Sequence, residues 1–413
     1  MTETNLVEKT TLNNGLTIVT ENVESVKSVS VGIWAKTGSR NETDRQAGIT
    51  HFLEHMLFKG TENRSSYDIA LSMESVGGYL NAFTSSEYTC YYSRCLDTQL
   101  EKALDVLSDM VLHPSFPEDE IAKEKKVVIE EMKMYRDRPS DYLMEKFSGA
   151  VFDGHPLGRP VLGFEETVSD FQRQDLYDYM NDRYQPDNLL VAVAGNMHHD
   201  EVVRLVDQFF SGVEVHGGAG QDFSLTPYEP RQQVLKKVIE QTHLMVGRRG
   251  LSFDHDDKYK LLLTNAILGG GMSSRLHQNI REKYGYCYTV SSFNRAYSDT
   301  GLYGVYVGTD VDYVDHAEEL IFKELSRLQN ERVPQKELDE AKAQLKGKLL
   351  LTLENMSNRM RRLAKSEIYY NRFITLDELI SNIEAVEAEE IQEFTGDFFD
   401  QSQFSKSVLL PED

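Results

Sequence analysis

The chain has 413 residues, of which 40% are hydrophobic and 27% are charged. That length predicts two or three domains, and that composition is typical of a globular protein, which excludes a disordered chain, a collagen or a coiled coil as a description of the whole. Lys and Arg together number 44 and Asp and Glu 67, so the net charge is −23. This balance argues against a nucleic-acid partner and favours basic ligands through long-range attraction.

The N-terminus and the cysteines bear on the compartment. Residues 1–9 are polar and acidic, without the basic and apolar regions of a secretory signal peptide. No apolar run approaches the roughly 20 residues that span a bilayer. Three cysteines are too few, and odd in number, for a disulfide framework. We therefore expect a cytoplasmic protein with no membrane partner.

Strands and helices of the first half follow from turn signals and apolar periodicity. Paired strands are expected over residues 1–35, where Asn13-Asn14-Gly15 is a turn signal and residues 28–34 alternate between polar and apolar. The further predicted elements, in chain order, are a helix at about 46–58, a helix near 66–76, strands across 79–95, helices at 98–112 and about 118–136, a buried strand at 188–195 and a helix at about 199–210.

Glycine and proline interrupt every pattern between Ser211 and Arg231. Such a stretch is typical of a linker. We therefore predict a linker over 212–231 that divides the chain into domains at 1–211 and 232–413.

The order of elements repeats between these halves. Pro117 opens a long helix in the first half, and Pro334, 217 positions later, opens one in the second. Each long helix is preceded by an amphipathic helix, at 98–112 and about 313–329, and by strands rich in Tyr and Thr. We interpret the repeat as an internal duplication, which predicts two similar α+β domains.

The segment His51-Phe52-Leu53-Glu54-His55 carries the strongest chemical signal. On a helix the two histidines lie one turn apart, about 40° around the axis, so both imidazoles can reach one ion, with Glu54 in the same sector. Two imidazoles beside a carboxylate are what a zinc hydrolase requires, and a catalytic site needs a third protein ligand. The composition predicts only about 0.05 chance matches to this pattern.

A third ligand is expected on the helix at about 118–136. At 100° per residue, Glu124 and Glu131 fall on its apolar face, whereas Glu130 points to the opposite side. Carboxylates in an apolar stripe are costly unless they are paired or bound to a cation. The residues themselves favour Glu131 or Glu124 and exclude Glu130.

These residues resemble the pitrilysin and insulin-degrading enzyme family, the inverted zincin metallopeptidases, in the short bacterial branch related to mitochondrial processing peptidase. The order H-x-x-E-H is that family's signature, and residues 47–61 match its metal helix nearly throughout. The resemblance implies Zn²⁺, one per chain, with His51, His55 and Glu131 as ligands. It implies Glu54 as the catalytic base and Glu124 as the companion that orients a ligand histidine.

The resemblance extends over nearly the whole chain. Residues 77–84 are similar to the family's edge strand, where the backbone of Asn81 and Ala82 pairs with a bound peptide. In the second half, residues 280–288 resemble the inactive domain, in which Arg281 and Tyr288 hold the substrate near the scissile bond. The resemblance implies largely antiparallel sheets covered by helices, two domains that enclose a chamber, and a homodimer.

The expected function is zinc-dependent cleavage of unfolded peptides or flexible termini, with a preference for basic or presequence-like peptides. No His-x-x-Glu-His pattern occurs after residue 231. The positions 217 residues after Glu124 and Glu131, which correspond to them in the repeat, are occupied by Ala341 and Lys348. One half is therefore expected to be catalytic and the other to line the chamber. The alternative is a non-catalytic or partner-dependent subunit of a processing complex.

Overall fold

The computed structural model describes residues 6–213 and 223–412, so residues 214–222 of the predicted linker lie outside it. The described chain forms two compact units, and each is assembled from three segments. Unit 1 comprises residues 1–133, 159–224 and 352–375, and unit 2 comprises residues 134–158, 225–351 and 376–413. The division into contiguous domains at 1–211 and 232–413 stays a prediction. The two units differ from it because residues 134–158 belong to unit 2 and residues 352–375 to unit 1.

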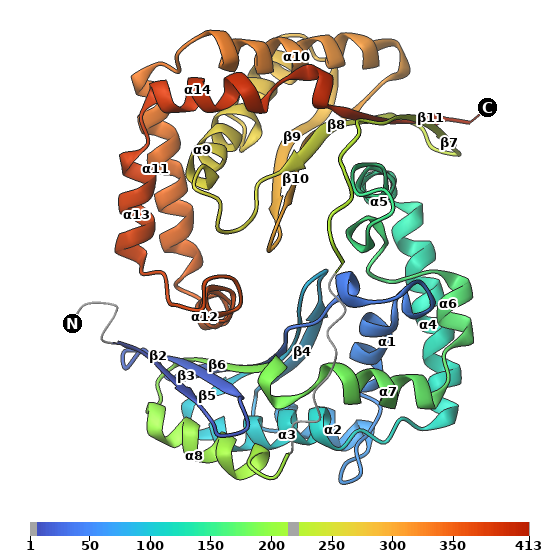
Figure 1. Ribbon diagram of the computed structural model, residues 1–413, viewed down its shortest axis with the longest axis vertical. Coiled ribbons are helices and arrows are strands. Elements are labelled where there is room, and N and C mark those ends of the chain that lie inside the picture. Colours follow the sequence, from blue (N-terminus) through green and yellow to red (C-terminus); the bar gives the residue numbers. More distant parts are fainter. Residues whose placement is uncertain (1–5, 214–222, 413) are drawn as a thin grey trace. The chain divides into compact units, whose positions relative to one another are not determined.

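Unit 1 is built on a six-stranded sheet with the order β1-β2-β6-β3-β5-β4 (Figure 1). Only the β2–β6 pair is parallel among the described pairings. The strands are β1 (Val7–Thr11), β2 (Thr17–Asn22), β3 (Ser28–Ala35), β4 (Tyr79–Thr84), β5 (Thr89–Leu96) and β6 (Leu189–Gly195). Every residue of β6 is buried, as expected of an apolar run that lies inside a sheet covered on both faces.

Helices pack against one face of this sheet in a common apolar core. The predicted stripe of the helix at 98–112 is confirmed, since Leu100, Leu104, Leu107 and Val111 are all buried. The helices of unit 1 from the first half are α1 (Ile49–Met56), α2 (Ser66–Glu74), α3 (Leu100–Leu112), α4 (Glu118–Asp137, whose last turn belongs to unit 2), α6 (Glu165–Asp170), α7 (Arg173–Arg183) and α8 (His199–Phe210).

Unit 2 is built on a five-stranded sheet with the order β7-β11-β8-β10-β9, in which only β7 and β11 pair in parallel. The strands are β7 (Gln232–Lys237), β8 (Thr242–Gly250), β9 (Cys287–Ala296), β10 (Gly301–Thr309) and β11 (Ser405–Pro411). This order matches β2-β6-β3-β5-β4 of unit 1, including the place of the parallel pair. The two similar α+β domains predicted from the repeat are therefore confirmed.

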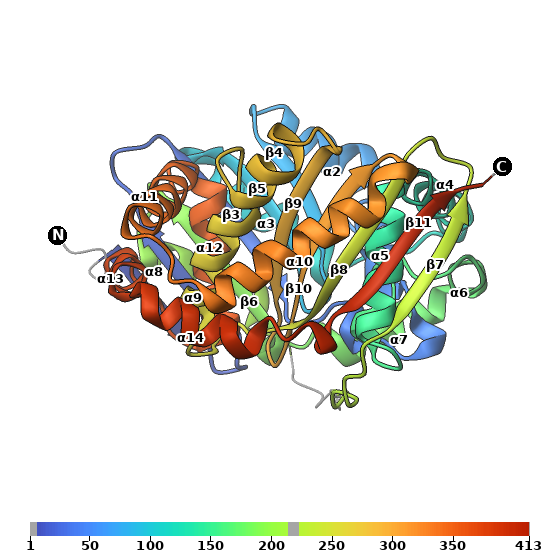
Figure 2. The same ribbon diagram turned by 90° about the horizontal axis from the view of Figure 1, so that it is seen from above.

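The helices of unit 2 from the second half are α9 (Lys258–Gly269), α10 (Val314–Asn330), α11 (Gln335–Thr352), α13 (Leu376–Ala385) and α14 (Ala388–Phe398). Figure 2 shows α10 running across the strands β8 and β10. Leu261 of α9 and Ile321 of α10 are fully buried in one core with Val305 of β10. The sheet of unit 2 is thus covered on this face by helices of its own half.

The opposite face of each sheet is covered by a helix from the other half of the chain. Helix α12 (Met356–Tyr370) buries Met360 and Leu363 against Trp34 of unit 1, and the indole Nε1 of Trp34 donates to Met360 Sδ at 3.3 Å. Helix α5 (Pro139–Val151) buries Phe147 in a core of unit 2 that also holds Leu409. Both sheets are thereby buried on two faces.

The elements predicted for the first half are present, with ends that differ by a few residues. The predicted helix at 46–58 is α1 over Ile49–Met56, preceded by a 3₁₀ turn at Asp44–Gln46. The helices α5, α6, α7, α9, α12, α13 and α14 were not predicted from the sequence. No helix within residues 6–213 and 223–412 is long and apolar enough to span a bilayer.

Candidate metal centre

Helix α1 is anchored by its apolar side and capped at its start. Phe52 and Met56 are fully buried. The carboxylate of Glu42 accepts hydrogen bonds from the backbone N–H groups of Gly48 and Thr50, at 2.8 and 2.9 Å. These bonds pair two of the amides that a helix start leaves unsatisfied. The remaining side of α1 is therefore held in a fixed orientation.

Three side chains from α1 and α4 bring ligand atoms to one point. His51 Nε2 lies 3.7 Å from Glu131 Oε2, and His55 Nε2 lies 3.5 Å from the same oxygen. All three ligand atoms lie within 4.8 Å of one another. In the part of the chain that the structure describes, this is the one group of three such residues with that spacing.

The donor set and its spacing fit a zinc ion. Ligand bonds of about 2.0–2.1 Å in tetrahedral geometry place neighbouring donors about 3.3 Å apart, slightly closer than the separations of 3.5 and 3.7 Å found here. Two imidazole nitrogens and one carboxylate oxygen are three ligands, which leaves a fourth position for water, as in catalytic zinc sites.

Glu124 orients His55 from behind. Its Oε2 lies 3.0 Å from His55 Nδ1, and its Oε1 lies 2.5 Å from Lys59 Nζ. Burial opposes ionisation of Glu124, but the contacts with His55 and Lys59 hold its pKa below the ordinary value. An ionised Glu124 accepts a hydrogen bond from Nδ1–H of His55, which makes Nε2 the nitrogen that can bind a metal.

The two histidines have opposite protonation behaviour. Burial, with the neighbouring His55, lowers the pKa of His51 to about 4. Burial also works against protonation of His55, but hydrogen bonds with Glu124 and Glu131 prevail and raise its pKa to about 9. At neutral pH His51 is thus ready to bind a metal, whereas His55 must first release a proton.

Glu54 lies beside the ligands and is held by β4. The hydroxyl of Thr84 donates a hydrogen bond to its Oε2. Burial raises the pKa of Glu54, and the bond from Thr84 opposes this shift. A carboxylate whose pKa is raised toward neutrality is suited to accept and return a proton.

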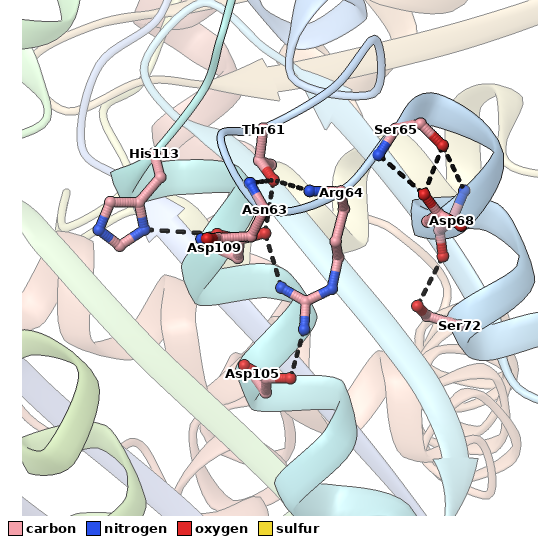
Figure 3. Close-up of polar contacts among 9 residues, drawn as sticks. All are labelled: Thr61, Asn63, Arg64, Ser65, Asp68, Ser72, Asp105, Asp109 and His113. Atoms are coloured by element: carbon pink, nitrogen blue, oxygen red, sulfur yellow. Dashed lines mark hydrogen bonds and ion pairs between the residues drawn. The ribbon is translucent and has the colours of Figure 1, made fainter.

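A polar network fixes the loop that carries Lys59. Asp109 of α3 accepts hydrogen bonds from Thr61, Asn63 and Arg64, each at 2.6 Å (Figure 3). Burial disfavours the charge on Asp109, but these three donors hold its pKa below the ordinary value. The network ties residues 61–64 to α3, so it sets where the preceding Lys59 can reach.

The residues expected to bind peptide lie on β4, at the edge of the sheet. Strand β4 pairs with β5 and ends the strand order, so none of the described strands pairs with its other side. The side-chain oxygen of Asn81 accepts from the backbone N–H of Ala82 at 2.8 Å. Thr84 of the same strand contacts Glu54, so β4 runs up to the ligand cluster.

Arg281 and Tyr288 belong to unit 2, where they contact each other. The guanidinium of Arg281 lies 5.1 Å from the ring centre of Tyr288, and its Nη1 lies 3.0 Å from His277 Nε2. Tyr288 begins β9 with its neighbour Cys287 and is 75% exposed. The pair is therefore accessible, and its expected role toward a substrate stays a prediction.

Sequence reasoning missed the roles of two residues that contact the cluster. Lys59 stands four positions after His55, at helical spacing, although α1 ends at Met56. Thr84 stands two positions after Ala82, so the alternation of β4 puts both side chains on the same face of the sheet. Both spacings can be seen in the sequence. The contacts of Lys59 with Glu124 and of Thr84 with Glu54 follow only from the fold, which brings these residues together. Glu130, which was excluded as a ligand, pairs with Lys133 at 2.7 Å instead.

Both halves of the chain match known proteins. Residues 17–165 match the family model described as insulinase, peptidase family M16, and residues 170–345 match the model described as the peptidase M16 inactive domain. The uncharacterized zinc protease YmxG of Bacillus subtilis is 42% identical over 398 residues, which are 95% of this chain and 97% of that protein. An uncharacterized zinc protease of Streptomyces coelicolor is 37% identical over 98% of this chain and 90% of its own length.

Two solved structures share the fold over almost the whole chain. A protease from Helicobacter pylori has a TM-score of 0.92 at 24% identity and covers 98% of this chain and 99% of its own. A peptidase M16 inactive domain protein from Pseudomonas fluorescens has a TM-score of 0.91 at 18% identity, with 98% of both chains covered. Together with the matched models and the close relatives, these findings confirm the predicted resemblance, and the chain belongs to peptidase family M16, the insulinase family.

Proposed function

We propose that this chain is a zinc-dependent endopeptidase that holds one Zn²⁺ through His51, His55 and Glu131. The observation that carries the proposal is the convergence of the three ligand atoms within 4.8 Å, beside the half-buried carboxylate of Glu54. Family membership and the zinc proteases among the relatives support a peptidase role.

The residues around the cluster divide the chemistry of peptide hydrolysis. A bound zinc ion would act as a Lewis acid and lower the pKa of a water molecule to about 7. Glu54 takes the proton of the attacking water and passes it to the leaving amine. Thr84 fixes the Glu54 carboxylate during this transfer, and Glu124 with Lys59 fixes the ring of His55.

Substrate binding is assigned to β4 and to unit 2. A peptide that adds as a strand to β4, beside Asn81 and Ala82, gains main-chain hydrogen bonds without strong sequence selection. Such a mode requires an extended chain, so unfolded peptides and flexible termini are the expected substrates. The net charge of −23 favours basic peptides. Arg281 and Tyr288 would hold the carbonyl and its developing negative charge.

The experiment that tests the proposal compares the wild type with Glu54→Gln. Both proteins are analysed for zinc, and their cuts in a peptide library are mapped by mass spectrometry. Equal zinc content, with cuts at least about 10²-fold slower in the variant, is expected from loss of a general base. Glu130→Gln is the matched control, because Glu130 is exposed and pairs with Lys133. Equal cutting by wild type and Glu54→Gln would contradict the proposal.

Gel filtration and activity measurements on the pure chain distinguish the predicted homodimer from the alternative, a subunit that depends on a partner. A pure chain that cuts peptides and elutes as a dimer in gel filtration supports the self-sufficient enzyme. Zinc-loaded protein that cuts nothing alone supports a subunit that needs a different partner chain.

A further inference from the structure

A pocket in unit 1 lies away from the metal ligands, on the opposite face of the same sheet. It has a volume of about 250 Å³ and is formed where the start of α12 meets β4 and β5. Tyr79, Tyr92 and Arg94 line it from the strands, and Arg361 lines it from the helix together with amide and hydroxyl side chains of the first turn. Its lining contains no Asp or Glu.

The two guanidinium groups of this pocket lack an acidic partner. Among the described residues, neither Arg94 nor Arg361 takes part in an ion pair, and Nε of Arg361 is buried without any partner. By contrast, Arg359, two positions earlier on α12, is paired with Glu21. Unpaired cations are unexpected in a chain with 67 acidic and 44 basic residues, because carboxylates are available to neutralise them.

The remaining groups of the pocket also suit an anion. Arg361 lies over the rings of Phe83 and Tyr92, at 4.7 and 5.1 Å, so its guanidinium is held in place. Arg361 Nη2 donates to the hydroxyl of Tyr92 at 3.2 Å, which leaves that hydroxyl proton free to be donated onward. The start of α12 adds the positive end of a helix dipole. An acceptor-rich, negatively charged group matches this set of donors.

The alternation of β4 relates this pocket to the metal cluster. Tyr79, Asn81 and Phe83 point to the face that α12 covers, since Tyr79 and Phe83 pair with Arg94 and Cys90 of β5. Thr84 points to the other face, where it contacts Glu54. Tyr79 and Thr84 are five residue steps apart along the strand, a span of about 17 Å.

We propose that this pocket binds a carboxylate of a peptide that lies along the edge of β4, four to six residues from the scissile bond. The inference rests on the proposed peptidase function and on strand addition to β4. Since an added strand continues the pleat, every second substrate residue points to the α12 face. The carboxylate comes from an Asp or Glu side chain or from the C-terminus of the peptide.

The test is a scan with fluorogenic peptides of one fixed cleavage site. A single Asp is moved through the third to eighth residue on either side of the scissile bond, with Asn at the same position as the neutral match. A second set ends at each of these positions with a free carboxylate or a carboxamide. We expect that, at one position, the Asp peptide has a KM about tenfold lower than its Asn match and an unchanged kcat. Weaker effects are expected two residues away. The second set shows whether a terminal carboxylate substitutes.

Variants assign the effect to the pocket. Arg94→Gln, at an exposed position, and Arg361→Gln are each expected to abolish the preference for Asp over Asn, while Arg361→Lys retains part of it. Arg204→Gln is the control, because Arg204 is exposed on α8 and does not line the pocket. Thermal unfolding of each variant shows that it is folded, and Arg94→Gln decides the matter if Arg361→Gln is unstable.

The outcomes separate this inference from the proposed function. If wild type cuts no peptide in a Glu54-dependent manner, the proposed function fails, and fluorescence anisotropy of the same labelled peptides still reports whether Asp tightens binding through Arg94. Equal KM for Asp and Asn at every position, in a wild type that cuts peptides, overturns the pocket assignment. So does a loss of preference that is the same in Arg94→Gln and Arg204→Gln.

Discussion

Zinc affinity is expected to depend on pH through one histidine. The pKa of His55 is raised to about 9, so below that pH a proton occupies the site that zinc must take. The pKa of His51 is lowered to about 4, so no proton on His51 competes with zinc at neutral pH. At pH 7, proton competition at His55 lowers the apparent affinity about 100-fold, and affinity rises about tenfold per pH unit up to pH 9.

Glu124→Gln acts on this balance in two opposite ways. Loss of the carboxylate that orients a ligand histidine typically costs 10–100-fold in metal affinity. The same loss lets the pKa of His55 fall toward its ordinary value, which reduces proton competition at neutral pH. The defect of Glu124→Gln is therefore expected to be within about tenfold at pH 7 and to reach about 10–100-fold at pH 9, where competition has vanished in both proteins.

The assay is a competition titration with a chromophoric zinc chelator from pH 6.5 to 9. Calorimetry in buffers of different ionisation enthalpy counts the released protons. Wild type is expected to release about one proton per zinc at pH 7 and the variant less, with Glu130→Gln behaving as wild type. A wild-type zinc affinity that does not change with pH, or a variant defect of the same size at every pH, would contradict proton competition at His55.

Three further predictions concern other parts of the chain. Glu131→Gln is expected to lose zinc in metal analysis whereas Glu130→Gln keeps it, because these neighbours lie about 100° apart on α4. Tyr288→Phe is expected to slow hydrolysis of a short fluorogenic peptide about 10²–10³-fold at unchanged zinc content if its hydroxyl stabilises the oxyanion, and unchanged turnover would reject that role. Met360→Ala is expected to cost about 2–5 kcal/mol in the free energy of unfolding, measured in urea, because Met360 is fully buried against Trp34.

The proposed metal ligands could be predicted from the sequence because their geometry is local, although only the family resemblance chose Glu131 over Glu124. His51 and His55 share one helix, so their spacing alone puts both imidazoles on one side. Glu124 and Glu131 share another, and the same periodicity separates them from Glu130. The structure brings the two helices together without changing the side that either one presents.

The exchange of helices between the halves could not be found in this way. Trp34 and Met360 are 326 positions apart, and an apolar stripe on a helix shows that it packs without showing against what. The strand β6 reads as buried on both faces, so a helix was required on each face of its sheet. The sequence pattern does not show that the helix on the second face, α12, comes from the other half of the chain.

Comparison of the two similar halves distinguishes the contribution of the fold to the metal site from the contribution of single side chains. Helix α11 follows α10 in unit 2 as α4 follows α3 in the first half. At the position of Glu124, however, α11 carries the buried Ala341. At the position of Glu131 it carries the exposed Lys348, whose ammonium donates to the carbonyl of Gly270 at 3.1 Å. A cation in place of a carboxylate would repel a metal ion. The lack of both carboxylates in the second half agrees with the description of the domain that residues 170–345 match as inactive.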